Sequence, residues 1–290
     1  MRRSGTLLLP LAALVLAAAL PALAAPGGRP RFGAYVSCSA SGRSHDAACS
    51  LGARPSAVFR SFRRGGVRYA VCVRRPGGHR HCRHKRTRVR GVRSRAAIGL
   101  SRPGRYTVSW LVHGARVKRV RFRARAPRVF VNGDSLAVGT KPYLPRDLPG
   151  WPIRQSASIS RHAPQGVGLL RSKGRGLARI VVMQLGTNDD PRATDAFRRA
   201  VRATMRIAGR SRFVVWPNIV RPRVAGTSYA GYNSILAAEN RRRDNLFVVD
   251  WTRMARRHRY WFGPDGVHPN ATGYMARAAA IAAKVRACLG

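Results

Sequence analysis

Three short polar segments, far apart in the sequence, carry the residue types that nucleophilic acyl chemistry requires. Ser135 lies in NGDSL, Asn188 lies in GTNDD, and His268 lies in DGVHP with Asp265 three residues before it. A serine hydroxyl becomes a nucleophile when a base removes its proton, and histidine is the usual base near neutral pH. A carboxylate on the other ring nitrogen fixes the tautomer, and an amide N–H stabilises a developing oxyanion. These residue types predict a serine esterase or acyl-transfer site, provided that the fold brings them together.

The elements around these segments predict a sheet with all three at one edge. Short apolar runs rich in β-branched and aromatic residues predict strands at 128–131, 152–154, 179–184, 212–216 and 246–249. Helical patterns follow at 165–172, 193–208, 229–241 and 272–288. This alternation is typical of a parallel α/β sheet, which gathers the carboxyl ends of its strands at one edge. We therefore expect the serine, the asparagine and the Asp/His pair to be neighbours.

The motifs GDSL, GTND and DGVHP, in this order, resemble the SGNH hydrolase family, also called the GDSL esterases and lipases. The resemblance covers about residues 128–287 of the 290-residue chain. It implies a flavodoxin-like three-layer α/β/α sandwich that hydrolyses or transfers acyl groups. Ser135 is then the expected nucleophile and first oxyanion N–H donor, and Asn188 the side-chain oxyanion donor. His268 and Asp265 complete the expected triad, and this chemistry needs no metal or organic cofactor.

One segment departs from the family pattern. The family's second block supplies a glycine whose backbone N–H completes the oxyanion hole, and here the matching segment reads QSASISR with Ser160 at the glycine position. A backbone donor survives the change if the local conformation does. Glycine permits a positive φ, which serine tolerates poorly. Because Ser160 aligns with that glycine, it is the expected third oxyanion donor, and Ser158 is the alternative.

Each motif also has a plainer structural interpretation. Ser135 could be a helix N-cap, because serine favours that position. Asn188 and Asp189 could cap the helix predicted from 193, and His268 with Pro269 could form only a turn before the last helix. We favour the catalytic interpretation because three such coincidences in the family's order are improbable.

Four further residues are candidates for contact with a substrate. Asp134 and Asn218 are expected at the same sheet edge and are assigned to substrate binding, although packing at a strand end explains Asn218 equally well. Arg161 and His162 could meet an anionic substrate, but a solvated surface is the favoured interpretation for both.

Residues 27–126 precede the α/β region, which spans 128–290, and predict a small β-sandwich. Apolar and polar residues alternate at 32–39, 57–63, 67–74, 106–113 and 116–125, with Gly, Pro and Ser between these runs. The stretch GRYTVSWLVHGARVKRVRFRA resembles the last hairpin of bacterial immunoglobulin-like domains. We therefore expect an immunoglobulin-like sandwich ahead of the α/β region.

Residues 1–25 predict a cleaved secretory signal. Arg2 and Arg3 are followed by an apolar stretch at 7–20 and by small residues at 22–25. An uncleaved anchor is the less favoured alternative, because Pro10, Pro21 and the alanine-rich end of this segment favour cleavage. The predicted localisation is secreted, with association to a cell wall.

The five cysteines are interpreted first as disulfides, since export places them in an oxidising compartment. Local pairing of Cys38 with Cys49 and of Cys72 with Cys82 is preferred among the three connectivities that four cysteines allow. His79, His81 and His84 surround Cys82 and raise the alternative of a metal site, which the disulfide interpretation disfavours. Cys288 is left over and is expected as a buried or partly exposed free thiol.

The formal net charge of +46 arises from 56 basic and only ten acidic residues. Such a field favours anionic partners, and the predicted export argues against nucleic acid. Asp46 is the only acidic residue between 27 and 126, so the predicted sandwich should bind an anionic wall polymer or a membrane surface.

These observations predict a secreted, monomeric serine esterase. Its expected substrate is a short acyl or acetyl ester on cell-wall or extracellular polysaccharide. O-acyl transfer with the same triad remains an alternative, and so does a non-catalytic wall-binding or adhesion protein that keeps the fold.

Overall fold

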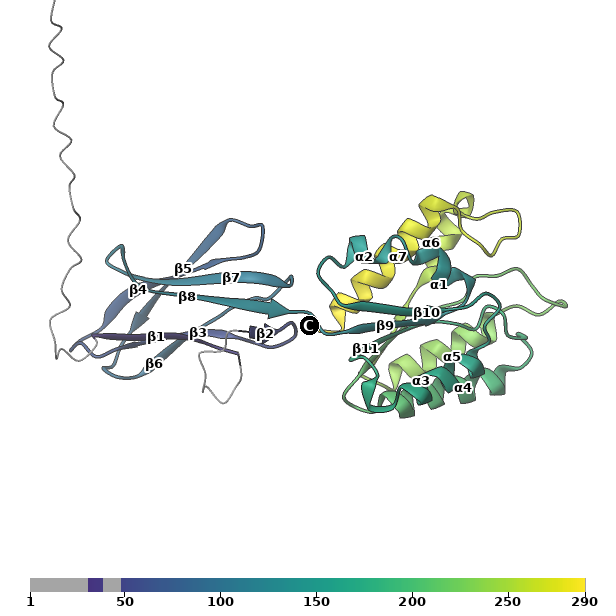
Figure 1. The fold of residues 1–290 in the computed structure, drawn as a ribbon, viewed down its shortest axis with the longest axis horizontal. Coiled ribbons are helices and arrows are strands. Elements are labelled where there is room, and N and C mark those ends of the chain that lie inside the picture. Colours follow the sequence, from purple (N-terminus) through teal and green to yellow (C-terminus); the bar gives the residue numbers. More distant parts are fainter. Residues whose placement is uncertain (1–30, 39–47, 290) are drawn as a thin grey trace, which may run out of the picture.

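The computed structural model describes residues 31–38 and 48–289, which form an all-β region followed by an α/β region (Figure 1). The predicted signal sequence at 1–25 lies outside the described residues, and so does Asp46. Within the described ranges, no helix has the length and apolar character needed to cross a bilayer. The chain passes from the first region to the second at residues 126–128.

The strands of the first region form two sheets. They are β1 Phe32–Ser37, β2 Ala48–Ser50, β3 Ser56–Ser61, β4 Val67–Arg74, β5 Arg80–Thr87, β6 Arg93–Ala97, β7 Gly104–Val112 and β8 Ala115–Arg125. The three-stranded sheet has the order β1-β3-β6, and the five-stranded sheet has the order β2-β8-β7-β4-β5. Figure 1 shows the two sheets stacked on one another.

Alternation along β7 and β8 decides which face of the five-stranded sheet is buried. Tyr106, Val108 and Trp110 of β7 and Phe122 of β8 are buried in the core between the sheets. Because successive side chains of a strand point to opposite faces, the residues between them face away from that core. Arg119, Arg121 and Arg123 of β8 therefore lie on the outer face of the sheet.

Sequence patterning predicts neither β2 nor β5 nor β6. β5 reads RHCRHKRT, which offers no aliphatic or aromatic residue for an alternating pattern, and it is an edge strand held by pairing with β4. Tertiary pairing thus overrides weak local patterning here. The immunoglobulin-like resemblance of this region stays a prediction.

The two predicted disulfides are present, Cys38–Cys49 and Cys72–Cys82. Cys72 and Cys82 lie directly opposite each other on β4 and β5. Because both sulfurs are used in the disulfide, the alternative thiolate metal site does not form from them. Cys288 is a buried free thiol, and burial raises its pKa to about 12.

The second region is built on a parallel sheet of five strands in the order β10-β9-β11-β12-β13. The strands are β9 Val129–Gly133, β10 Ile153–Ala157, β11 Ile180–Gln184, β12 Phe213–Pro217 and β13 Leu246–Val249. In this order β10 lies on one side of β9, and β11, β12 and β13 follow one another on its other side. The predicted flavodoxin-like α/β architecture is confirmed, with its switch point between β9 and β11.

Helices cover both faces of this sheet. They are α1 Ser135–Thr140, α2 Leu144–Asp147, α3 Ala163–Lys173, α4 Thr194–Ala208, α5 Ala230–Arg241, α6 Trp251–Arg257 and α7 Ala271–Ala287. One core lies between the sheet and α3, α4 and α5, and another lies between the sheet and α1, α2 and α7 (Figure 1). The short helices α1, α2 and α6 are not predicted from the sequence, because each is too short to show a helical repeat.

Candidate active site

The turn between β9 and α1 presents Ser135. β9 is fully buried, and the chain leaves it at Gly133 to enter α1 after one residue. Asp134 is the N-cap of α1, since its Oδ1 accepts a hydrogen bond of 2.9 Å from the backbone N–H of Leu136. Ser135 is therefore the first helical residue and not the cap, which removes the plainer interpretation of the serine.

Gly133 allows this turn to be tight. A Cβ at this position would lie 2.4 Å from the Cβ of Ala137 and 3.0 Å from the Cβ of Gln184. Such contacts are far shorter than atoms tolerate, so α1 can approach the end of the sheet only because position 133 has no side chain. The glycine of the GDSL motif thus places Ser135 at the sheet edge.

Ser135, His268 and Asp265 form a continuous chain of hydrogen-bonding distances. Ser135 Oγ lies 2.8 Å from His268 Nε2. His268 Nδ1 lies 2.6 Å from Asp265 Oδ2. The three side chains, which come from the β9–α1 turn and from the loop before α7, are brought together as expected. This is the arrangement in which a carboxylate orients an imidazole toward a hydroxyl.

The loop before α7 is braced by its own backbone. The N–H of Gly263 donates to the carbonyl of His268 at 2.9 Å, and Asp265 Oδ1 accepts from the N–H groups of Val267 and His268 at 2.9 and 3.0 Å. Hydrogen bonding to the His268 ring is the main cause that lowers the pKa of Asp265 to about 2, and the two N–H groups contribute less. The carboxylate is therefore ionised across the whole neutral range, as an orienting acid must be.

Asn188 follows β11, at the switch point of the sheet. Its Nδ2 donates to Asp134 Oδ2 at 3.2 Å, and the second hydrogen of the amide has only a long contact of 3.5 Å with the Arg161 carbonyl. Asp134 is 0% exposed, and burial raises its pKa to about 6. The buried carboxyl holds the amide in one orientation and leaves one N–H for a ligand.

Ser160 has a φ of +60°, the left-handed conformation that the glycine of the family pattern would supply. It lies in a turn closed by a 3.2 Å hydrogen bond from the Arg161 N–H to the Ser158 carbonyl, with the positive φ at the third position as in a type II turn. Serine thus adopts the backbone that the sequence analysis expected it to tolerate poorly. Strained residues of this kind concentrate at functional sites.

The same turn separates the two serine candidates for the oxyanion hole. The N–H of Ser158 donates to the Gly133 carbonyl at 3.1 Å, so it is already used in extending the sheet. The N–H of Ser160 has no acceptor among residues 31–38 and 48–289. Of the two, only Ser160 offers a backbone donor that is free to bind a ligand.

Arg161 and His162 take structural positions that the sequence does not reveal. The Arg161 guanidinium donates to Asn132 Oδ1 and to the carbonyls of Gly133 and Ser156 at 3.1, 3.3 and 2.7 Å, and it therefore ties the ends of β9 and β10 together. It is neither a solvated side chain nor one directed at a substrate.

Asp189 caps a different helix from the expected one. Its carboxylate accepts from the Ala163 N–H at 3.0 and 3.2 Å, at the start of α3, and it lies 3.5 Å from His162 Nδ1. The helix that begins at Thr194 follows Asp189 in sequence but is not capped by it. His162 thus remains at the surface beside this cap.

The two residues assigned to substrate binding need correction. Asp134 is fully buried and both of its oxygens accept hydrogen bonds, so it positions Leu136 and Asn188 and cannot touch a substrate. The Asn218 amide donates to Asp250 and Thr252 at 3.1 and 3.0 Å and accepts from the Thr252 N–H at 2.8 Å. Asn218 therefore fixes the start of α6, as the packing alternative holds.

A buried arginine behind the nucleophile is missed by motif reasoning. Arg277 is 3% exposed, donates from Nε to Gln184 Oε1 at 3.0 Å, and lies 5.2 Å from the ring centre of Trp251. Gln184 in turn donates to Thr140 Oγ1 at 2.9 Å. A sequence signal does exist, because Arg277 lies four residues before Ile281 on the buried face of α7.

An open cleft of about 920 Å³ adjoins the loop that carries His268. Gly263 and Gly266 form one wall, and the other walls come from the segment after β12 and from α5 and α6. Its cationic side chains are Arg221, Arg223, Arg256 and Arg259. The cleft is therefore basic as well as accessible, although Ser135 and His268 are not part of its walls.

Comparisons with known proteins give partial likenesses. No family model matches the chain. Two Staphylococcus aureus proteins, from strains MSSA476 and COL, have names that give O-acetyl transfer as an inferred activity. Each is 29% identical over 147 residues, which is 50% of this chain and 22% of the relative. The matched part of this chain thus spans about a fifth of these curated relatives.

Among solved structures, the C-terminal catalytic domain of Streptococcus pneumoniae peptidoglycan O-acetyltransferase A is 18% identical, with 57% of this chain and 93% of that chain covered and a TM-score of 0.46. A lipolytic G-D-S-L protein of Veillonella parvula is 15% identical, with coverages of 54% and 95% and a TM-score of 0.45. Likenesses at this level add nothing to what the strand order itself establishes.

Proposed function

We propose that this protein is a serine-dependent enzyme that hydrolyses short acyl esters through an acyl-enzyme. The observation that supports it most is the run of short distances from Ser135 Oγ through the His268 ring to Asp265. The structural roles of Asp134 and Asp189 account for the neighbouring motif residues, whereas the side chains of Ser135 and His268 make no other hydrogen bond within the described residues.

The proposed reaction begins with attack of Ser135 Oγ on the ester carbonyl. His268 Nε2 takes the hydroxyl proton as the new C–O bond forms, and ionised Asp265 stabilises the resulting imidazolium. His268 then returns the proton to the departing alcohol, which leaves the acyl group on Ser135. Water that His268 deprotonates then attacks the acyl carbon, the bond between that carbon and Ser135 Oγ breaks, and His268 returns the proton to Oγ as the acid leaves.

Three N–H groups are proposed to hold the oxyanion. The backbone N–H of Ser135 and that of Ser160 have no acceptor in the described chain, and the second amide hydrogen of Asn188 makes only the long 3.5 Å contact with the Arg161 carbonyl. Donors held rigidly before the reaction stabilise the charge that develops on the carbonyl oxygen, each by about 3 kcal/mol. The buried Asp134 carboxyl and the Ser160 turn supply that rigidity.

The proposed substrate is an acetyl or other short acyl ester on a polysaccharide outside the cell. The basic cleft beside the His268 loop favours an alcohol portion that carries negative charge. Export is proposed from the sequence of the first 25 residues, and two disulfides are typical of proteins in oxidising compartments.

Covalent labelling tests the nucleophile directly. Purified protein is treated with a serine-directed phosphonate, and its mass is compared with that of Ser135→Ala and of Ser158→Ala, a matched control at an exposed serine of the same edge. We expect one adduct on the parent chain and on Ser158→Ala, and none on Ser135→Ala. Labelling of Ser135→Ala to the same extent would contradict the proposal and would favour the non-catalytic alternative.

A series of acyl esters of increasing chain length tests the substrate. We expect the highest kcat/KM for acetyl or propionyl esters and a fall for longer chains, with His268→Ala inactive throughout. A preference for long chains would contradict the short-chain assignment while leaving the triad intact.

O-acetyl transfer is the second candidate, and the names of the Staphylococcus aureus relatives favour it. In this reaction a sugar hydroxyl replaces water in the second step, with the same side chains in the same roles. An assay with and without a carbohydrate acceptor separates the two reactions. Transfer is supported if the acceptor is acetylated faster than the donor is hydrolysed in its absence.

A further inference from the structure

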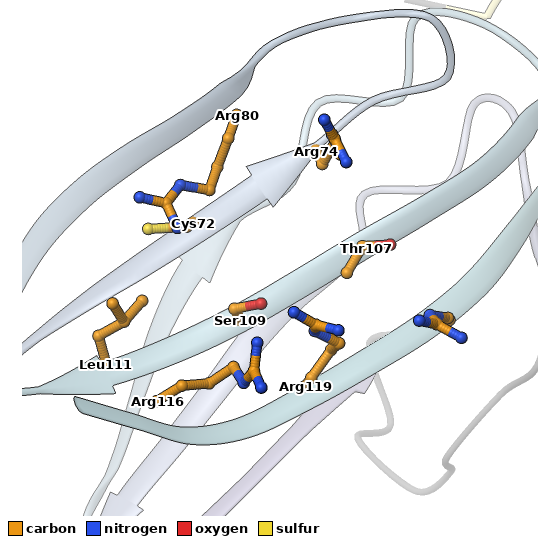
Figure 2. A pocket seen from close by; sticks show the side chains of 9 residues that line it. Cys72, Arg74, Arg80, Thr107, Ser109, Leu111, Arg116 and Arg119 are labelled. Atoms are coloured by element: carbon orange, nitrogen blue, oxygen red, sulfur yellow. The ribbon is translucent and has the colours of Figure 1, made fainter. Parts of the chain in front are cut away.

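The outer face of the five-stranded sheet in the β region contains a hollow of about 430 Å³. Figure 2 shows side chains from β4, β5, β7 and β8 converging on it. Five of the residues that line it are arginines: Arg74, Arg80, Arg116, Arg119 and Arg121. We name this feature the arginine hollow.

The strand register brings these side chains together, so the abundance of arginine on the surface is not the only reason that they lie close to one another. Arg119 pairs with Ser109 and Arg121 pairs with Thr107 across β7 and β8. Arg74 pairs with Thr107 on one side and with Arg80 on the other. Paired residues share a face and lie about 5 Å apart at Cβ. The arginines are therefore held around the two hydroxyls by the backbone ladder itself.

Within residues 31–38 and 48–289, no carboxylate forms an ion pair with these arginines. Residues 31–38 and 48–126 contain no Asp or Glu, and every ion pair in the described part of the chain lies at residue 162 or beyond. Like charges held this close repel one another. An anion that bound among them would relieve the repulsion. The arginines therefore do not stabilise the unliganded fold, and a bound anion would stabilise it.

The outer face of β8 continues the row of arginines beyond the hollow, so more than one anionic group could bind along it. Arg119, Arg121 and Arg123 recur at every second residue of β8, which spaces them by about 7 Å along the strand. A guanidinium binds carboxylate and phosphate oxygens in a bidentate manner. A row of such groups matches a chain molecule whose anionic groups repeat along its length.

The other lining residues decide what kind of chain molecule fits. Thr107 and Ser109 offer hydroxyls that suit the hydroxyls of a sugar or polyol. Among the described residues that line the hollow none is aromatic, so a nucleobase has no ring to stack on, and the apolar lining is limited to Leu111 and Cys72. A lipid surface would require a larger apolar contact.

We propose that the arginine hollow binds a linear anionic polysaccharide or polyol polymer, with carboxylate or phosphate groups on the arginines and hydroxyls on Thr107 and Ser109. The site lies outside the esterase site and does not depend on the proposed reaction. If both proposals hold, a polymer bound here raises the local concentration of its esters at Ser135.

Binding is tested on the purified protein with two probes, a polygalacturonate for carboxylates and a linear polyphosphate for phosphates. The test variant carries Arg74→Gln, Arg119→Gln and Arg121→Gln. The matched control carries Arg63→Gln, Arg64→Gln and Arg90→Gln, three exposed arginines of the same region that do not line the hollow. Both variants lose the same charge, and circular dichroism checks that both are folded.

At 0.15 M salt we expect the parent and the control variant to bind at least one polymer with Kd values within about twofold of each other. The hollow variant should bind more weakly, by about tenfold for each guanidinium that no longer pairs with an anionic group. The probe with the lower Kd identifies the anion. Equal weakening in both variants would overturn the proposal, because binding would then follow net charge alone.

Two further outcomes would also overturn it. One is the absence of binding to either polymer at this salt concentration. The other is tighter binding to anionic lipid vesicles or to a single-stranded oligonucleotide, with the same dependence on Arg119 and Arg121, which would assign the hollow to a membrane or to nucleic acid. The monomers, galacturonate and inorganic phosphate, should bind far more weakly than the polymers because each occupies only one arginine pair.

Discussion

Arginine has opposite surroundings in the two regions of this chain. Nine of the ten acidic residues lie in the α/β region, where Glu239 accepts from Arg202 at 2.9 Å and from Arg243 at 3.0 Å. In the β region, the arginines of the hollow have no carboxylate partner within the described residues. The same side chain therefore stabilises the fold in one region and remains available to an outside partner in the other.

The difference shows what the few carboxylates do. Asp265 orients His268, Asp134 holds Asn188 and caps α1, and Asp189 caps α3. Asp250 accepts from the Arg253 N–H in the same way at the start of α6. Six of the nine carboxylates in the α/β region accept a hydrogen bond from a nearby donor, so removal of one of these should have a specific effect and not a general one.

The largest expected effect is on the carboxylate of the proposed triad. Asp265→Asn removes the charge that stabilises an imidazolium and favours the wrong tautomer of His268. The corresponding change in a serine protease lowers kcat by about 10⁴, and we expect a loss of that order in the hydrolysis of a short ester.

Asp190→Asn is the matched control, because Asp190 is also an exposed aspartate of this edge but pairs only with Arg192. Its kcat should stay within about twofold of the parent, since exposed pairs contribute little. A loss of less than tenfold for Asp265→Asn would show that carboxylates of the α/β region do not have the specific tasks assigned to them.

The next effect is on the oxyanion. Asn188→Ala removes the side-chain donor, and we expect kcat to fall by about 10² to 10³ with KM little changed, because the contact forms fully only in the transition state. Asn245→Ala makes the same chemical change where the amide donates to the carbonyls of Gly209 and Arg212. That control should alter stability and not kcat. A rise in KM at constant kcat for Asn188→Ala would assign the amide to ground-state binding.

A third effect concerns the buried acid that holds Asn188. Burial raises the pKa of Asp134 from an ordinary value near 4 to about 6, so the folded state binds the proton more tightly than the unfolded state. The free energy of unfolding should therefore fall as pH rises from 4 to 6, by an amount on the order of 3 kcal/mol. Asp265 acts with the opposite sign at lower pH, because its lowered pKa adds stability as pH rises from about 2 to 4.

Urea denaturation of the parent and of Asp134→Asn across this pH range separates the contributions of Asp134 and Asp265 to the free energy of unfolding. The amide cannot ionise, so its variant should lose most of the decline between pH 4 and 6 and keep the rise below pH 4, while Asp189, whose pKa burial also raises, accounts for the remaining decline. Asp195→Asn, at a side chain that is 80% exposed, should keep both. If the full decline survives in Asp134→Asn, another group titrates there.

The fold of the α/β region could be predicted because its strands are short apolar runs. The site could be predicted because its polar residues lie in loops next to predicted strands or helices. Leu246–Val249 is predicted with its exact bounds, and the other four strands are found within three residues of theirs. Ser135 and Asn188 each follow a predicted strand and His268 precedes a predicted helix, so the topology of a parallel sheet suffices to bring them together.

Other features depend on tertiary contacts that no local pattern encodes. β5 is an edge strand of polar residues, and only its pairing with β4 makes it a strand. The task of Asp189 lies at Ala163, 26 residues away, and sequence proximity suggested the wrong helix. Asn218 was open to two interpretations because a strand-end amide can face either a ligand or a neighbouring helix. The sequence raises the question whether Ser160 adopts a positive φ, and only the structure of its turn shows that it does.

The smallest expected effect compares one substitution in both regions. Arg202→Gln removes a partner of Glu239, whose side chain is only 5% exposed, and should lower the free energy of unfolding of the α/β region by about 1 to 2 kcal/mol. Arg119→Gln removes no ion-pair partner within the described residues and relieves repulsion between neighbouring arginines. It should change the stability of the β region by less than about 0.5 kcal/mol, in the stabilising direction at low salt.

Hydrogen exchange follows the two regions separately, at low and at high ionic strength. The stabilisation by Arg119→Gln should vanish at high salt because screening already weakens the repulsion, whereas the destabilisation by Arg202→Gln should largely persist because Glu239 is buried. If Arg119→Gln destabilises the β region as much as Arg202→Gln destabilises the α/β region, then Arg119 has an internal partner after all. The arginines of the hollow would then serve the fold, as those around Glu239 do, and would not be free to hold a polymer.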